Sequence, residues 1–147
     1  MPLDKLGASP NNPVTVDILD RLRAAAGEGP VLITTHDSPD PDALASGKGL
    51  ATLFQNTWGI ETHLLYCGLV ARAENKAMLR YLANEWSYTE NLDNLKGYSA
   101  VALVDSQPGA GNNSLPEKYT PKIVIDHHHP LRQQLEPVEF VDIRTDI

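Results

Sequence analysis

The chain has 147 residues, the length of a single domain, with 41% hydrophobic residues and a formal net charge of −7. This negative charge argues against a surface that follows long duplex nucleic acid, which requires clustered Lys and Arg. It does not exclude a small phosphorylated substrate, because bound divalent cations reverse the field locally. The amino terminus lacks the apolar core of a signal peptide, and no apolar run reaches the length of a membrane span. We therefore expect a cytoplasmic protein that does not enter the membrane.

Periodicity predicts helices and strands that alternate along the chain. Residues 1–13, rich in Pro and Asn, predict a flexible leader before a domain over 14–147. Helical spacing predicts helices over about 15–26, 41–58 and 72–83, and short apolar runs predict strands over 31–35, 62–66, 99–104, 122–125 and 138–143. Residues 84–98 are ambiguous, with an extended piece at 86–89 and a helical turn at 91–96 as candidates. Gly47 and Gly49 are expected to let the second helix approach the sheet closely.

This alternation of helices and buried strands indicates an α/β fold with a mostly parallel sheet of about five strands and helices on both faces. Three of the strands run into residues that can hold a metal. His36 follows the first strand, Asp105 follows the strand over 99–104, and Asp126-His127-His128 follow the run 123–125. Because chemistry in an open α/β sheet collects at the carboxyl ends of the strands, these residues together predict a divalent-metal site.

Each of these motifs also has a purely structural explanation. Pro41 suits the first position of a helix, with Asp40 as its N-cap and Asp42 in its first turn. That explains both acids but not His36, so a helix start and a ligand cluster both stay open. A histidine run such as 127–129 can also be a solvated loop. His63 alternates with apolar neighbours in a strand and is expected to be structural.

Two further groups are candidates for binding substrate. Arg72 and Asn75 open the third helix just after the second strand, so they face the same edge of the sheet. An Arg there could bind phosphate, or it could be an ordinary surface residue. The loop over 107–114 includes Asn112 and Asn113, whose amides could line a substrate pocket, although turn formation favours the same residue types.

The pattern H-x-x-x-D-x-D at 36–42, then Asp105, then Asp-His-His at 126–128 resembles the DHH phosphoesterase family over nearly the whole chain. The resemblance implies a three-layer Rossmann-like domain with two divalent cations, Mn²⁺ first, with Mg²⁺ or Co²⁺ as alternatives. One cation would be held by His36, Asp40 and Asp105, and the other by Asp42, Asp105 and His127, with Asp105 bridging. As catalytic residues, His128 would contact the substrate phosphate and Asp126 would orient the histidines. His129 receives no role.

Within the family, the chain most resembles the branch that acts on short oligoribonucleotides, phosphoadenosine phosphate or cyclic dinucleotides. The resemblance therefore implies hydrolysis of phosphodiester or phosphomonoester bonds in small nucleotides or short oligonucleotides. Pyrophosphate or polyphosphate hydrolysis and a non-catalytic nucleotide- or metal-binding module stay open as alternatives, as does a homodimer. The family's fourth acidic motif and its carboxy-terminal substrate domain are not found within residues 1–147. We therefore expect a truncated phosphoesterase domain that is weak or inactive alone.

Overall fold

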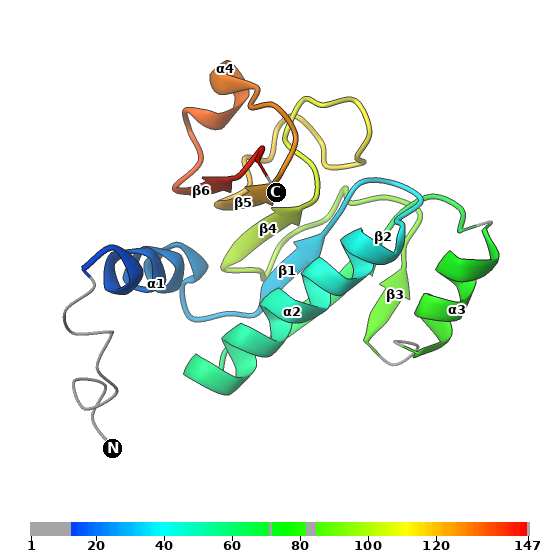
Figure 1. Cartoon of the computed structure of the whole chain (residues 1–147), viewed down its shortest axis with the longest axis horizontal. Helices are drawn as coiled ribbons and strands as arrows, with labels where there is room; N and C mark the ends of the chain where they lie inside the picture. Colours follow the sequence, from blue (N-terminus) through cyan, green and yellow to red (C-terminus); the bar gives the residue numbers. More distant parts are fainter. Residues whose placement is uncertain (1–12, 71, 82–84, 147) are drawn as a thin grey trace.

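Six parallel strands form one sheet at the centre of the computed structural model, which describes residues 13–70, 72–81 and 85–146 (Figure 1). In chain order they are β1 (Val31–Thr34), β2 (Thr62–Tyr66), β3 (Trp86–Tyr88), β4 (Ala100–Val104), β5 (Ile123–Asp126) and β6 (Phe140–Ile143). Their order across the sheet is β3-β2-β1-β4-β5-β6, and every neighbouring pair is parallel. This is the strand order of a doubly wound Rossmann sheet, so the predicted α/β class is confirmed.

The predicted strands all form, and the ambiguous segment supplies a sixth. Its extended candidate is β3, which pairs with β2 at the edge of the sheet. The helical turn expected at 91–96 is wrong, because residues 91–95 have no regular secondary structure. Leu92 and Leu95 are instead buried in a cluster with Leu32 and Val101 of the sheet. Burial of these two leucines thus holds the segment against the sheet without a helix.

Three helices cover one face of the sheet: α1 (Pro13–Ala26), α2 (Pro41–Trp58) and α3 (Ala73–Tyr81) (Figure 1). Leu22 of α1 and Phe54 of α2 share a core cluster with Ile33 of β1 and Ala102 of β4. The third layer is made of connecting segments and the short α4 (Arg132–Leu135), where Leu135 packs with Leu103. Of the predicted leader 1–13, only Pro13 lies within the described residues, where it begins α1.

Close approach of α2 to the sheet depends on Gly47. A Cβ at this position would overlap the ring of Trp86, whose Nε1 donates a hydrogen bond to the Leu44 carbonyl oxygen at 3.1 Å. The expectation for Gly47 is therefore confirmed. That for Gly49 is wrong, because a Cβ there would meet no atom within 4 Å. Gly49 lies on the exposed side of the helix, away from the sheet.

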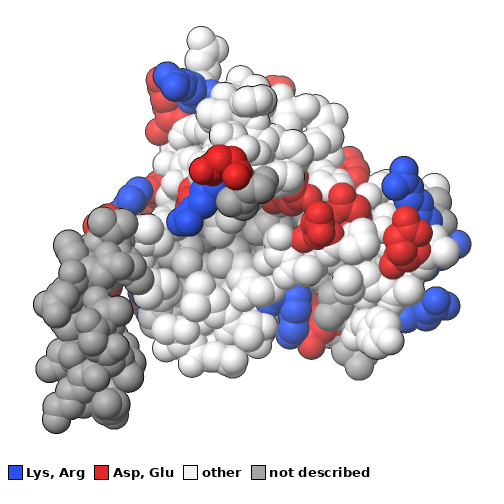
Figure 2. Space-filling view, viewed as in Figure 1, with Lys and Arg blue, Asp and Glu red and all other residues white. Residues whose placement is uncertain are grey.

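The charged residues of the described surface are mixed in sign. On the face shown in Figure 2, Lys and Arg are scattered among Asp and Glu and form no continuous basic stripe. Among the described residues, no helix combines the length and the apolar character needed to cross a membrane.

Candidate metal centre

The carboxyl ends of β1 and β4 lie side by side where the order of the strands reverses. From β1 the chain continues outward to β2 and β3, and from β4 it continues outward on the other side to β5 and β6. Such a switch point opens a crevice between the loops that leave the two central strands. His36 leaves β1 and Asp105 leaves β4, so both predicted ligands flank this crevice.

Asp105 connects two histidines through its two carboxylate oxygens. Oδ2 lies 3.4 Å from Nε2 of His36, and Oδ1 lies 2.9 Å from Nε2 of His127. The residue has a left-handed backbone with φ of 56°, and its amide donates to the Ile125 carbonyl oxygen at 2.9 Å. Asp tolerates this conformation better than most residues, and such geometry concentrates at functional sites. One buried carboxylate is thus shared between two imidazoles, as a bridging ligand would be.

The orientation of the His36 ring leaves Nε2 facing the acids. Nδ1 donates to the carbonyl oxygen of Asp37 at 2.9 Å, and a carbonyl oxygen can only accept. The proton of the neutral ring therefore stays on Nδ1, and the lone pair of Nε2 points at Asp105 and Asp40. This arrangement, in which a backbone carbonyl fixes the tautomer, is the usual one for a metal-ligating histidine.

His36 and Asp105 form an ion pair in the metal-free chain. The Asp105 carboxylate raises the pKa of His36 to about 9, against burial, which lowers it. Burial by itself would raise the pKa of Asp105, but His36 and then His127 outweigh it and lower that pKa below its ordinary value. A cation bound here would have to displace the proton on Nε2 of His36.

The helix start and the ligand cluster proposed for 36–42 coexist in one structure. Oδ1 of Asp40 accepts from the Ala43 amide at 2.9 Å, which caps α2, and the same atom lies 3.9 Å from Nε2 of His36. His36, Asp40 and Asp105 offer ligand atoms that all lie within 4.8 Å of one another. The first predicted ligand set is therefore brought together.

The second predicted ligand set is more open. Asp42 is exposed on the first turn of α2 and lines a cavity of about 400 Å³ with Asp105 and His127. Asp42 is not part of a group of ligand atoms within 4.8 Å among the described residues. Asp126, His127 and His128 do form such a group with Asp105. Asp105 and His127 thus belong to both arrangements.

Asp126 and His128 form a hydrogen-bonded pair beside this group. The Asp126 side chain is 1% exposed, and its Oδ1 accepts from Nδ1 of His128 at 2.7 Å. Because the carboxylate accepts, Nδ1 of His128 carries a proton and Nε2 lies on the opposite side of the ring. The His128 side chain is 56% exposed. A buried acid is thus hydrogen-bonded to a histidine that reaches solvent. His129 is also exposed, without a side-chain role in the group.

Gln107 is a buried part of the site that sequence reasoning missed. Its side-chain Nε2 donates to Oδ2 of Asp126 at 2.8 Å, and its Oε1 accepts from the Leu131 amide at 2.8 Å. The residue is 2% exposed. Its one sequence signal is a long amide among the small residues of a turn-forming loop, two positions after Asp105. That signal does not reveal that the side chain points inward.

Among the described residues, the predicted substrate-binding residues form no side-chain hydrogen bond or ion pair with the metal candidates, but Asn112 lines a cavity of about 260 Å³ with Asp126 and His128. Asn112 accepts from the Ser106 hydroxyl through Oδ1 at 2.7 Å, and Asn113 donates to Ser106 and to the Gln107 carbonyl at 2.9 Å each. Both amides therefore brace the loop. Among the described residues, Arg72 is exposed and Asn75 is buried, with no hydrogen bond or ion pair to the acids and histidines. A role in substrate binding stays a prediction for all four.

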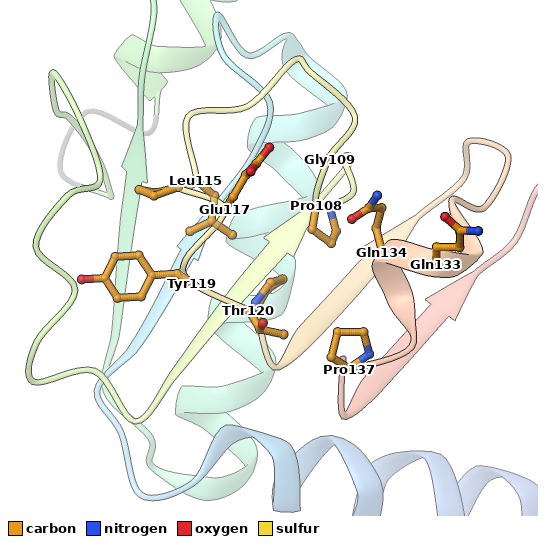
Figure 3. Close-up of a pocket in the computed structure, with 11 residues that line it drawn as sticks. Pro108, Gly109, Leu115, Glu117, Tyr119, Thr120, Gln133, Gln134 and Pro137 are labelled. Carbon is orange, nitrogen blue, oxygen red and sulfur yellow. The ribbon is translucent and has the colours of Figure 1, made fainter.

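A separate cavity of about 440 Å³ lies on the loop-covered face, beside α4 (Figure 3). Pro108 and Gln134 flank one part of it, and Tyr119 and Thr120 belong to the segment that enters β5. Among the described residues that line it, Glu117 is the one carboxylate and none is a histidine. The chemistry therefore belongs to the switch-point crevice rather than to this cavity.

No protein-family model matches the chain, but several proteins are similar to it. An uncharacterized protein of Methanocaldococcus jannaschii is 34% identical over 121 residues, which are 82% of this chain and 24% of that protein. A probable manganese-dependent inorganic pyrophosphatase of Streptococcus agalactiae is 28% identical over 116 residues, 74% of this chain and 37% of the enzyme. The bifunctional oligoribonuclease and PAP phosphatase NrnA of Thermus thermophilus is 33% identical over 104 residues, 70% of this chain and 29% of the enzyme.

These similarities agree with the resemblance found in the motifs, because two of the relatives are named as a pyrophosphatase and as an oligoribonuclease and PAP phosphatase, which are hydrolases of phosphate bonds. The chain spans about a quarter to just over a third of the length of these relatives.

Proposed function

We propose that this chain is the metal-binding part of a two-metal phosphoesterase of the DHH family that hydrolyses small nucleotides or short oligonucleotides. The observation that carries the proposal is the Asp105 carboxylate, whose oxygens face His36 at 3.4 Å and His127 at 2.9 Å at the switch point of the sheet. The carboxylates of the ligand set suit Mn²⁺ and Mg²⁺, and the described ligand groups include no thiolate, the ligand that selects soft metals.

In this proposal, five residues would be metal ligands and His128 would bind the substrate. His36 and Asp40 would hold one cation, Asp42 and His127 the other, and Asp105 would bridge both. Two bound cations would supply a water of lowered pKa and neutralise the charge of the phosphoryl group. Because Nδ1 of His128 donates to Asp126, Nε2 faces outward, where its N–H in the doubly protonated ring would donate a hydrogen bond to a phosphoryl oxygen. This contact would hold the phosphoryl group in line for attack.

Hydrolysis of pyrophosphate is the second candidate, favoured by the similarity to the Streptococcus agalactiae pyrophosphatase. It would use the same cations and the same His128 contact, so the metal centre does not separate the two functions. The difference lies in whether the group beyond the phosphate is a nucleoside or a second phosphate.

Comparison of substrates tests the proposal. Because the resemblance implies a fourth acidic motif and a substrate domain, the assay uses the complete gene product with saturating Mn²⁺. We expect hydrolysis of a dinucleotide or of phosphoadenosine phosphate with a kcat/KM at least about tenfold above that for pyrophosphate. The His128→Gln variant should lose most of this activity, whereas Gln55→Met, far along α2, should keep it.

The opposite order of substrates would replace the nuclease function with pyrophosphate hydrolysis. Binding of Mn²⁺ without turnover of any of the three substrates would instead favour a non-catalytic module.

A further inference from the structure

Gln107 holds the carboxylate that orients His128. We propose that Gln107 is a positioning residue, which acts through Asp126 to fix the His128 ring with Nδ1 inward and Nε2 toward the substrate. The substrate part of this inference rests on the proposed function. The effect of Gln107 on the ring does not, because it depends only on hydrogen bonds within the chain.

The surroundings of the Gln107 amide determine which way it points. Oε1 lies 2.8 Å from the Leu131 amide nitrogen, which can only donate. Nε2 lies 2.8 Å from Oδ2 of Asp126 and 3.3 and 3.2 Å from the carbonyl oxygens of His128 and His129, all of which can only accept. A flipped amide would oppose donor to donor and acceptor to acceptor, so this orientation is enforced. Gln107 thereby ties Asp126 and the turn after β5 into one unit.

Asp126 transmits this constraint to the histidine. Gln107 occupies Oδ2, which leaves Oδ1 for Nδ1 of His128 at 2.7 Å. With both oxygens engaged in a side chain that is 1% exposed, the carboxylate cannot rotate without leaving a buried acceptor unpaired. The His128 ring is 56% exposed, and its contact with the His127 ring, at 4.4 Å between ring centres, does not distinguish its two nitrogens. The order of the ring therefore comes from the Gln107–Asp126 pair.

An apolar residue of similar length isolates the hydrogen bonds of Gln107. Gln107→Met keeps a long, unbranched side chain but removes the donor to Asp126 and the acceptor for Leu131. The matched control is Gln55→Met on α2, which removes one exposed hydrogen bond to Thr62 of 3.0 Å. Both variants lose an amide, but only the first touches Asp126.

The first measurement is the tautomer of His128 in the metal-free chain, from the ¹⁵N shifts of its ring at a pH where the ring is neutral. The wild-type chain and Gln55→Met should carry the proton on Nδ1. Gln107→Met should move a substantial fraction to Nε2. A wild-type ring protonated on Nε2, or a Gln107→Met ring unchanged from wild type, would overturn the proposal.

If Gln107→Met does not fold, two measurements on the wild-type chain still test the positioning role of Gln107. The first is the His128 tautomer itself. The second is the exchange of the Gln107 side-chain amide protons with solvent, which should be slowed because they are buried and bonded. Free exchange of these protons would contradict a positioning role.

A second measurement connects the ring to phosphate. With saturating Mn²⁺, binding of inorganic phosphate should weaken about 10–100-fold in Gln107→Met, the usual cost of disturbing a residue behind a ligand. The reason is that Asp126 would no longer hold the doubly protonated ring with Nδ1 inward and the Nε2–H turned outward. Phosphate binding should stay unchanged in Gln55→Met. Equal phosphate affinity in all three proteins would reject the positioning role. Failure of the wild-type protein to bind Mn²⁺ and phosphate would instead reject the proposed function, while the tautomer would still decide the role of Gln107.

Discussion

At the scale of single residues, the candidate metal centre is built around one acid, Asp105, shared between two histidines. The sequence alone predicts some of the residues of this centre and misses others. His36, Asp105 and Asp126 were predictable because each follows an apolar run, and parallel strands bring their carboxyl ends together. Gln107 was not predictable, because its role depends on burial against residues about 20 positions later. The bracing roles of Asn112 and Asn113 were likewise hidden, since turn residues look alike in sequence whether or not they bind substrate.

The His36–Asp105 pair predicts how the stability of the metal-free chain depends on pH. The folded chain holds the His36 proton up to a pKa of about 9, whereas the unfolded chain releases it near 6.5. The pair therefore contributes its full stability below pH 6.5 and loses it as the pH rises to about 9. Urea unfolding with a chelator should show a fall of order 1–3 kcal/mol over this range.

The His36→Gln variant serves as the control for this pH effect. It should have a much flatter profile between pH 6.5 and 9, because the raised pKa is absent. A wild-type chain whose stability rises over this range, or a variant with the same slope, would show that the pair does not stabilise the fold.

Two histidines should differ sharply in their effect on metal binding. His127 lies 2.9 Å from Asp105, whereas His63 is bonded to the Tyr98 hydroxyl at 2.9 Å and to Glu61 at 3.2 Å. His127→Gln should weaken Mn²⁺ binding at least about tenfold, the lower limit expected for loss of a ligand. His63→Gln should leave it nearly unchanged. Calorimetric titration of both variants checks this, and a larger loss in His63→Gln would reverse the two assignments.

At the scale of elements, strands were predicted better than the segments between them. Runs rich in β-branched residues such as 31–35 identify buried strands from local sequence alone. The segment over 84–98 was ambiguous in sequence, because packing of Leu92 against the distant Leu32 decides its structure. The short α4 has only four residues and no side-chain cap, so it left no periodic signal.

The two glycines of α2 provide a matched test of how the helix packs. Gly47→Ala would push a methyl group into the Trp86 ring, which is buried and held by the Leu44 carbonyl, and should cost about 1–3 kcal/mol. Gly49→Ala meets nothing and should stabilise the helix by about 0.5–1 kcal/mol. Urea unfolding of both variants measures the difference. A Gly47→Ala variant as stable as Gly49→Ala would mean that α2 does not approach β3 this closely.

At the scale of the whole molecule, the strand order puts the motifs together. An α/β class follows from the alternation of helices and strands, but the reversal between β1 and β4 depends on tertiary pairing and cannot be read from periodicity. The ligand candidates consequently come from distant segments, with Asp105 about 70 residues and Asp126 about 90 residues after His36. A cation bound among them would join the loops after β1, β4 and β5.

Mn²⁺ should therefore stabilise the fold as a whole. A ligand that binds only the folded chain adds about 2.7 kcal/mol at a concentration 100 times its Kd. Thermal unfolding followed by circular dichroism should show a midpoint that rises with Mn²⁺ concentration. The control is Asp17→Asn on the exposed side of α1, which should keep this response. A midpoint independent of Mn²⁺ in the wild-type chain would contradict a metal centre at the switch point.

The Asp105→Asn variant tests the shared carboxylate most directly. Calorimetric titration with Mn²⁺ should show binding to the wild-type chain and to Asp17→Asn with the same affinity and stoichiometry. In Asp105→Asn, which removes the charge between His36 and His127, affinity should fall at least about tenfold for every bound ion, because the ions share this ligand. Equal affinity and stoichiometry in Asp105→Asn and the wild type would show that Asp105 does not bridge a metal centre.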